Sequence, residues 1–165
     1  MKTFLTLLAL SPIALAALPP GVVPLPGTEN LKPAQPSEIT EVALQKSRCL
    51  TDCPAYRVTF SADGSFTYIG MYNVERMGEH TGQVSAGRLQ QIFRYVDEID
   101  FFSFDTLYTV PYPDNATVST TVIEKGRQKT VQNYANSGPA TLWALEALLE
   151  SLLETATWNQ GGATQ

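Results

Sequence analysis

The sequence predicts an α+β protein, a two-layer sandwich in which about five mainly antiparallel strands form a sheet and two helices cover one face of it. Two observations carry this prediction. Apolar and polar residues alternate in several segments between residues 38 and 134, and short turns join these segments, which favours antiparallel pairing. Two other segments place apolar residues at helical spacing, and each follows a strand hairpin, so the expected order is βββα-ββα.

The strands are expected to form hairpins around glycine turns. Asp63-Gly64 joins the second strand to the third, because both residues tolerate the positive φ angles of a tight turn. Gly126 turns the later pair, and residues 73–84 are expected to be a polar loop with glycines and no apolar alternation. The expected strands cover residues 38–47, 56–60, 66–70, 116–124 and 128–134.

The helices are predicted from their caps and apolar stripes. The first is expected to begin after Ser85, a residue type that caps helix N-termini, and to stop near residues 98–100, before an apolar plug at 101–104. The second is expected from about Pro139 to Thr157. The residues expected to face the sheet are Leu89, Ile92, Phe93 and Val96, then Leu142, Leu145, Leu149, Leu152 and Ala156, with Glu146, Glu150 and Glu154 on the exposed face of the second helix.

The N-terminal sequence indicates an export signal. A lysine, a short apolar run and a small-x-small sequence predict a signal peptide over residues 1–16, cleaved near Ala16–Ala17. A buried N-terminal helix is the alternative. We expect a Pro/Gly-rich linker at 17–37, a single domain at 38–158 and a flexible tail at 159–165. The protein is therefore expected to be secreted or periplasmic, without a transmembrane anchor, since the apolar run is too short to span a bilayer.

Charge and composition limit the partners. The net charge is -5 and no basic run occurs, which argues against nucleic acid as a partner. Asn115-Ala116-Thr117 is a glycosylation sequon that matters only in a host that glycosylates.

Cys49 and Cys53 are the only cysteines of the chain. Export favours a structural disulfide that clamps the loop before the second strand. A redox pair is the alternative, although such pairs usually have two residues between the cysteines and sit at a helix N-terminus. Metal binding is a third and weaker interpretation.

Several motifs together resemble a known family. The specific block is Cys49-x3-Cys53-Pro54-x-Tyr56, and the sequence around it resembles the domain-of-unknown-function family 6438 from about Ile39 to Leu153. The family has no assigned activity, so the resemblance implies one exported domain and no catalytic residues. The remaining matching features are Asp63-Gly64, Tyr68-x-Gly70, Gly78, Phe101–Phe104, Tyr112, Asp114, Gly126 and Pro139.

No catalytic set stands out. His80 is the only histidine and lies in a glycine-flanked polar segment. We expect it to be a solvated loop residue, and a general base is the alternative. Acidic residues cluster at the end of the first helix without the spacing of a calcium loop. No cofactor or metal is expected. The acidic residues concerned are Asp97, Glu98, Asp100 and Asp105.

Aromatic residues outside the predicted core indicate a binding surface, because tyrosine and tryptophan are enriched at interface hot spots. We expect the 107–115 loop and an adjoining 72–82 loop to contact an unknown protein or cell-envelope component. The alternative is that the 107–115 loop buries its own aromatics. The function expected is a non-enzymatic binding module; the alternatives are a thiol–disulfide redox protein using Cys49 and Cys53, and a hydrolase with an unrecognised acidic site. The candidate binding residues are Tyr72, His80, Tyr108, Tyr112, Asp114 and Trp143.

Overall fold

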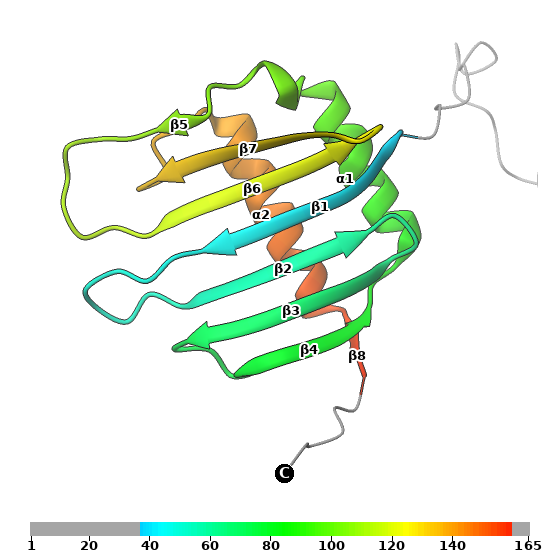
Figure 1. The fold of residues 1–165 in the computed structure, drawn as a ribbon, viewed down its shortest axis with the longest axis horizontal. Helices are drawn as coiled ribbons and strands as arrows, with labels where there is room; N and C mark the ends of the chain where they lie inside the picture. Colours follow the sequence, from blue (N-terminus) through cyan, green and yellow to red (C-terminus); the bar gives the residue numbers. More distant parts are fainter. Residues whose placement is uncertain (1–36, 160–165) are drawn as a thin grey trace, which may run out of the picture. The chain divides into compact units, whose positions relative to one another are not determined.

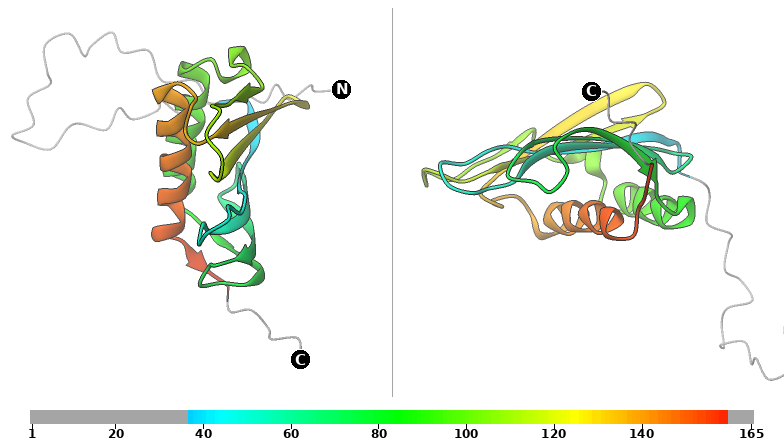
Figure 2. Two further views of the ribbon diagram at one scale, coloured as in Figure 1. Left: turned by 90° about the vertical axis from the view of Figure 1, so that its left-hand side faces the viewer. Right: turned by 90° about the horizontal axis from the view of Figure 1, so that it is seen from below.

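The structure is a computed structural model that describes residues 37–159. In this part of the chain, strands form a single sheet and two helices lie side by side against one of its faces, while the other face is open (Figures 1 and 2). The protein is therefore α+β. The expected signal peptide with its cleavage site, the linker up to residue 36 and the tail from residue 160 lie outside the described residues.

The sheet has eight strands, in the spatial order β5-β7-β6-β1-β2-β3-β4-β8. Neighbours are antiparallel, except that β5 runs parallel to β7. The helices are α1 (Ala86–Glu98) and α2 (Ala140–Glu154), and a 3₁₀ turn, η2 (Phe101–Ser103), follows α1. The strands are β1 (Ile39–Lys46), β2 (Ala55–Ser61), β3 (Ser65–Tyr72), β4 (Gly78–Gln83), β5 (Leu107–Tyr108), β6 (Thr117–Glu124), β7 (Arg127–Tyr134) and β8 (Thr157–Trp158).

The prediction of about five strands in the order βββα-ββα is wrong, because β4, β5 and β8 were not expected. The predicted polar loop at 73–84 contains β4, which pairs with β3 from Gly78 opposite Gly70 to Gln83 opposite Ser65. Its glycines and polar residues give no apolar alternation, so only the ladder with β3 makes it a strand. β5 and β8 have two residues each, too few for any periodic signal.

The hairpin of β2 and β3 is present as predicted. Gly64 has φ +89°, and the carboxylate of Asp63 accepts a hydrogen bond from the Ser65 amide at 2.9 Å, which closes the turn. The hairpin of β6 and β7 also turns where it was expected, at Lys125 and Gly126, both with positive φ.

The core lies between the sheet and the two helices. The predicted stripe of α1 is buried, and the Ser85 side chain accepts a hydrogen bond from the Arg88 amide at 3.4 Å, which confirms the cap. The leucines at 142, 145, 149 and 152 are buried on the inner face of α2, as predicted. The helix is shorter than predicted, because it ends at Glu154, so Ala156 follows it and Thr157 lies in β8. The sheet residues that face the helices include Val42, Leu44, Tyr56, Val58, Phe60, Phe66, Tyr68, Val122 and Val131.

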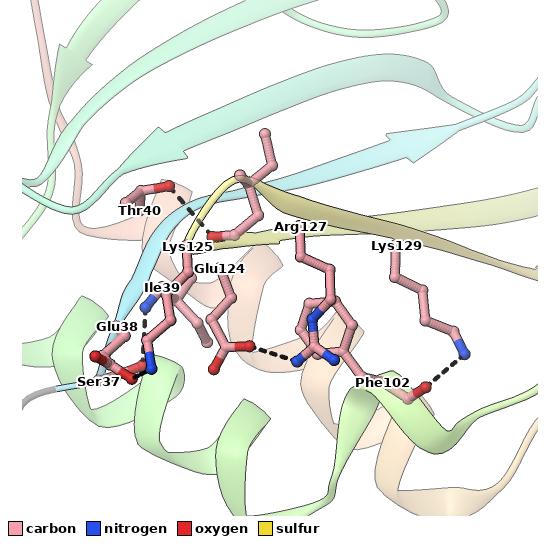
Figure 3. A network of polar contacts seen from close by, with 10 residues as sticks. Ser37, Glu38, Ile39, Thr40, Phe102, Glu124, Lys125, Arg127 and Lys129 are labelled. Carbon is pink, nitrogen blue, oxygen red and sulfur yellow. Dashed lines mark hydrogen bonds and ion pairs between the residues drawn. The ribbon is translucent and has the colours of Figure 1, made fainter.

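The phenylalanine segment after α1 is held against β7 (Figure 3). The Lys129 ammonium donates to the carbonyl oxygen of Phe102 at 2.8 Å and to that of Phe104. The Arg127 guanidinium lies 3.8 Å from the centre of the Phe102 ring and pairs with Glu124. These contacts close the edge of the core at its β7 end, where Phe101 is fully buried.

A glycine lets the chain cross back over β3. A Cβ atom at position 70 would lie 1.8 Å from the carbonyl oxygen of Arg76. Residues 74–76 can therefore fold across the helix-facing side of β3 only because Gly70 has no side chain. Val74 of this segment packs against the core.

Replacing Gly70 by alanine should therefore lower the free energy of unfolding by about 1–3 kcal/mol, the usual range for overpacking a core. Urea unfolding monitored by circular dichroism measures this. The matched control is Gly87→Ala, because its Cβ would meet no atom closer than 3.8 Å and alanine favours the helix. Equal stability of Gly70→Ala and wild type would show that the 74–76 segment can move away.

Candidate functional site

Loops meet at one end of the strands, and the loop that holds the cysteines lies among them (Figure 1). This disulfide loop, residues 47–54, joins β1 to β2. Its Leu50 amide donates a hydrogen bond to the Asp114 carboxylate in the loop between β5 and β6. Its Asp52 carbonyl accepts a hydrogen bond from the side chain of Asn73, at the end of β3. The disulfide loop therefore connects two loops that are remote in sequence.

Cys49 and Cys53 form the disulfide that the sequence predicts. The bond spans the tip of the disulfide loop, directly before β2, and no helix begins there. A helix N-terminus is the usual stabiliser of a reactive thiolate, and this site has a strand in its place. The position suits a clamp that holds the loop against its neighbours.

The predicted binding residues do not form one surface. Tyr112 is 67% exposed, and Asp114 beside it is exposed and bonded to the disulfide loop. Tyr108 is half-buried on β5, where its hydroxyl accepts from the Asp105 amide at 3.1 Å and its ring packs on Phe104. Trp143 is exposed on the first turn of α2.

The remaining candidates lie at the other edge of the sheet. Tyr72 is half-buried under the guanidinium of Arg48, 3.9 Å from the ring centre. His80 lies on β4, with Nε2 2.9 Å from the carbonyl oxygen of Met77 and its ring 6.2 Å from that of Trp158. The 72–82 segment is thus mostly strand. The disulfide loop lies between this segment and the 107–115 loop, so the two predicted binding loops do not adjoin.

A polar cluster between α2 and the sheet was not predicted from the sequence. Glu146, expected on the exposed face, is only 4% exposed. Its Oε2 accepts a hydrogen bond from Asn133 of β7 at 3.0 Å, and Asn133 in turn accepts from the Gly138 amide at 2.8 Å. The signal was present, because Glu146 follows Leu142 by four residues and precedes Leu149 by three, which places it on their face of the helix.

One turn later, Glu150 joins α2 to the central strands. Its Oε1 accepts a hydrogen bond from the Lys46 ammonium of β1 at 2.9 Å and another from the Tyr56 hydroxyl of β2. Burial and the neighbouring Glu150 carboxylate raise the pKa of Tyr56, so this hydroxyl stays protonated and remains a donor.

A cavity of about 280 Å³ opens beside the Lys46 stem and the disulfide. Two amide side chains, four apolar residues, Cys53 and an ammonium already paired with Glu150 line it, which suits recognition of a small group more than bond-making. It is lined by Lys46, Cys53, Pro54, Asn115, Ala116, Val118, Ala135 and Asn136.

The acidic cluster after α1 does not assemble into a site in the structure. Asp97, Glu98, Asp100 and Asp105 are exposed. Among residues 37–159, no three histidine, cysteine or acidic side chains converge closely enough to hold a metal ion. Within the same range, no helix is both long and apolar enough to cross a membrane.

These features define a disulfide-clamped α+β domain with an open sheet face and a loop-bearing end. The chain belongs to the family described as Domain of unknown function (DUF6438), whose sequence model matches residues 40–153. A comparison with curated proteins finds no match.

Glu146 makes the stability of the fold depend on pH. Its pKa is raised to about 7, mainly by burial and further by the charge of Glu150, while the hydrogen bond from Asn133 and the charge of Lys46 oppose the rise. Because the raised pKa favours the protonated form in the folded state, the stabilisation is complete below the ordinary pKa of 4.5 and is lost as the pH rises to about 7.

The variant Glu146→Gln should therefore have a higher free energy of unfolding than wild type at pH 8, by up to about 3 kcal/mol, since one pKa unit corresponds to roughly 1.4 kcal/mol. In this variant the free energy of unfolding should no longer fall between pH 4.5 and 7. Urea titrations across this range measure both effects. Glu154→Gln is the control, since Glu154 is exposed on the same helix and should leave the slope unchanged. A wild-type slope in Glu146→Gln would mean that another group carries it.

Proposed function

We propose that this protein is an exported, non-enzymatic binding domain that contacts a protein or cell-envelope component through the loop end of its sheet. The observation that carries the proposal is the pair of large apolar side chains presented there. Leu50 is 87% exposed on the disulfide loop, and Tyr112 is 67% exposed on the neighbouring loop. The bond from the Leu50 amide to Asp114 ties these two loops together.

Presentation on braced loops favours binding. A loop that is already ordered loses less conformational entropy when a partner docks, so more of the contact energy appears as affinity. The disulfide shortens the free part of the 47–54 loop, and the Tyr134 hydroxyl donates a hydrogen bond to the Tyr112 carbonyl oxygen, which holds the second loop. Tyrosine is also among the residues enriched at interface hot spots.

Export is part of the proposal. The N-terminal pattern of a charged residue, an apolar run and a small-x-small site supports a signal peptide, and a disulfide persists in oxidising compartments outside the cytosol. We therefore place the protein in the secreted or periplasmic compartment.

A photo-crosslinking residue at position 112, in protein expressed in its native host, should yield a discrete crosslinked adduct that Leu50→Ser removes. The adduct should be lost because Leu50→Ser removes an apolar side chain that contacts the partner. The substitution should leave the melting temperature unchanged because Leu50 is exposed. The matched control is Leu148→Ser, which removes an exposed leucine from α2, away from the loop end.

Tyr108→Ala supplies a second contrast. Because Tyr108 packs on Phe104, this change should lower the melting temperature, whereas Tyr112→Ala should not. An adduct that persists in Leu50→Ser, or that forms equally from a probe at Gln128 on the open sheet face, would refute a contact at the loop end.

The second candidate is a thiol–disulfide redox protein, which one observation favours: Cys53 lines a cavity and is therefore accessible to a small reactant. Against it, the cysteines precede a strand, and the neighbouring Lys46 is already paired with Glu150.

The reduction potential separates the two candidates. We expect a value below about -300 mV, which is typical of structural disulfides. Equilibration of the purified protein with glutathione buffers, followed by counting of free thiols, measures it. A value between about -120 and -230 mV would place the pair among catalytic disulfides and favour the redox function.

A further inference from the structure

A second cavity, of about 550 Å³, lies away from the disulfide, where β3, residues 75–76, the end of α2 and β8 come together. This volume is within the range of roughly 300–1,000 Å³ that is typical of small-molecule sites. Its walls combine two aromatic rings, the apolar side chains of a leucine and an alanine, one cation and two carboxylates. The groups used below are Tyr68, Glu75, Arg76, Leu153, Glu154 and Trp158.

Tyr68 contributes a buried ring with an unpaired hydroxyl. The side chain is 6% exposed, its ring stacks on Tyr56 at 5.3 Å between centroids, and the Trp158 ring meets it edge-on at 5.4 Å. No residue of the described range exchanges a hydrogen bond with its hydroxyl, whose oxygen is open to the cavity and not fully buried. Since Tyr68 lines the cavity, a ligand there can supply the partner.

Arg76 contributes a positive charge to the same space. Its guanidinium lies 4.6 Å from the centre of the Trp158 ring, and it forms no ion pair with any residue between 37 and 159. Burial raises the pKa of Tyr68 and the nearby Arg76 charge lowers it, so the guanidinium and the hydroxyl act on one another. A hydroxyl beside a guanidinium is a pair of donors that suits a carboxylate.

The opposite charge is also present. Glu75 and Glu154 line the cavity with exposed carboxylates, and neither is in an ion pair within the described part of the chain. These carboxylates would repel a simple anion and attract an ammonium group. Leu153 and Trp158 supply an apolar wall for an uncharged side chain.

We propose that this cavity binds a small amino-acid-like zwitterion with an apolar side chain. Its carboxylate accepts hydrogen bonds from Tyr68 and Arg76, its ammonium group lies near Glu75 and Glu154, and its side chain packs against Leu153 and Trp158. The site is independent of the proposed loop-end contact, because neither Leu50 nor Tyr112 lines it.

Matched ligands test the charge requirement. Phenylalanine carries both charges, 3-phenylpropanoate only the carboxylate, and phenethylamine only the ammonium group. In calorimetric titrations of the full chain, phenylalanine should bind at least tenfold more tightly than either single-charge compound. It should also raise the melting temperature at millimolar concentration, because a ligand that binds only the folded state stabilises it.

Variants test the residues. Tyr68→Phe keeps the stacked ring and removes only the hydroxyl, so it should fold normally and bind phenylalanine about tenfold more weakly. Arg76→Gln should abolish detectable binding. Arg57→Gln is the control, because it removes an exposed arginine from the open face of the sheet and should leave the affinity unchanged.

Several results would overturn the proposal. Absence of any heat and of any thermal shift with phenylalanine would exclude the site. Equal binding of 3-phenylpropanoate would make it a plain anion site, and equal binding of phenethylamine a cation site. Undiminished binding in Tyr68→Phe, whose folding is checked by circular dichroism, would move any ligand elsewhere.

Discussion

The packing of the α2 leucines on the central strands is the interaction on which most of the arrangement depends, because it buries the apolar faces of both layers. Glu150 adds a polar contact to this packing. The Glu150 carboxylate bonds Lys46 at the end of β1 and Tyr56 at the start of β2, so one side chain of the helix is joined to two neighbouring strands. The Glu150 side chain is 39% exposed, so this contact adds to the apolar packing of α2 and does not replace it. Glu146, one turn earlier, adds the bond to Asn133.

Both cavities follow from this placement. On one side, Lys46 borders the smaller cavity next to the disulfide. On the other side, the Tyr56 ring stacks on Tyr68, and the end of α2 together with β8 closes the larger cavity over β3. The larger cavity also needs Gly70, whose missing side chain admits the segment that carries Arg76. The Glu150 contact thus lies between the loop end that we propose contacts a macromolecule and the cavity that we propose binds a small ligand.

Features encoded by short stretches of sequence could be predicted. The β2–β3 hairpin depends on Asp63 and Gly64, the start of α1 on Ser85, and the disulfide on two cysteines four positions apart, and all of them are present. Features that arise from pairing could not be predicted, because β4 becomes a strand only beside β3 and the two-residue strands exist only through their neighbours. Of the expected surface, Tyr112 and Asp114 lie together at the loop end, whereas Tyr72 and His80 lie across the disulfide loop from them.

The sequence by itself determined the α+β class, the inner faces of both helices and the motifs that mark the family, since periodicity, caps and turn residues act over a few neighbouring positions. The tertiary structure decided the strand order, the burial of Glu146 and the assembly of both cavities. These depend on groups from distant parts of the chain, such as Tyr68, Arg76 and Trp158, and no local pattern records which of them will meet once α2 lies on the sheet. A glutamate on a leucine face is ambiguous in sequence, because only the fold places Asn133 opposite it, where its amide donates a hydrogen bond to the buried carboxylate.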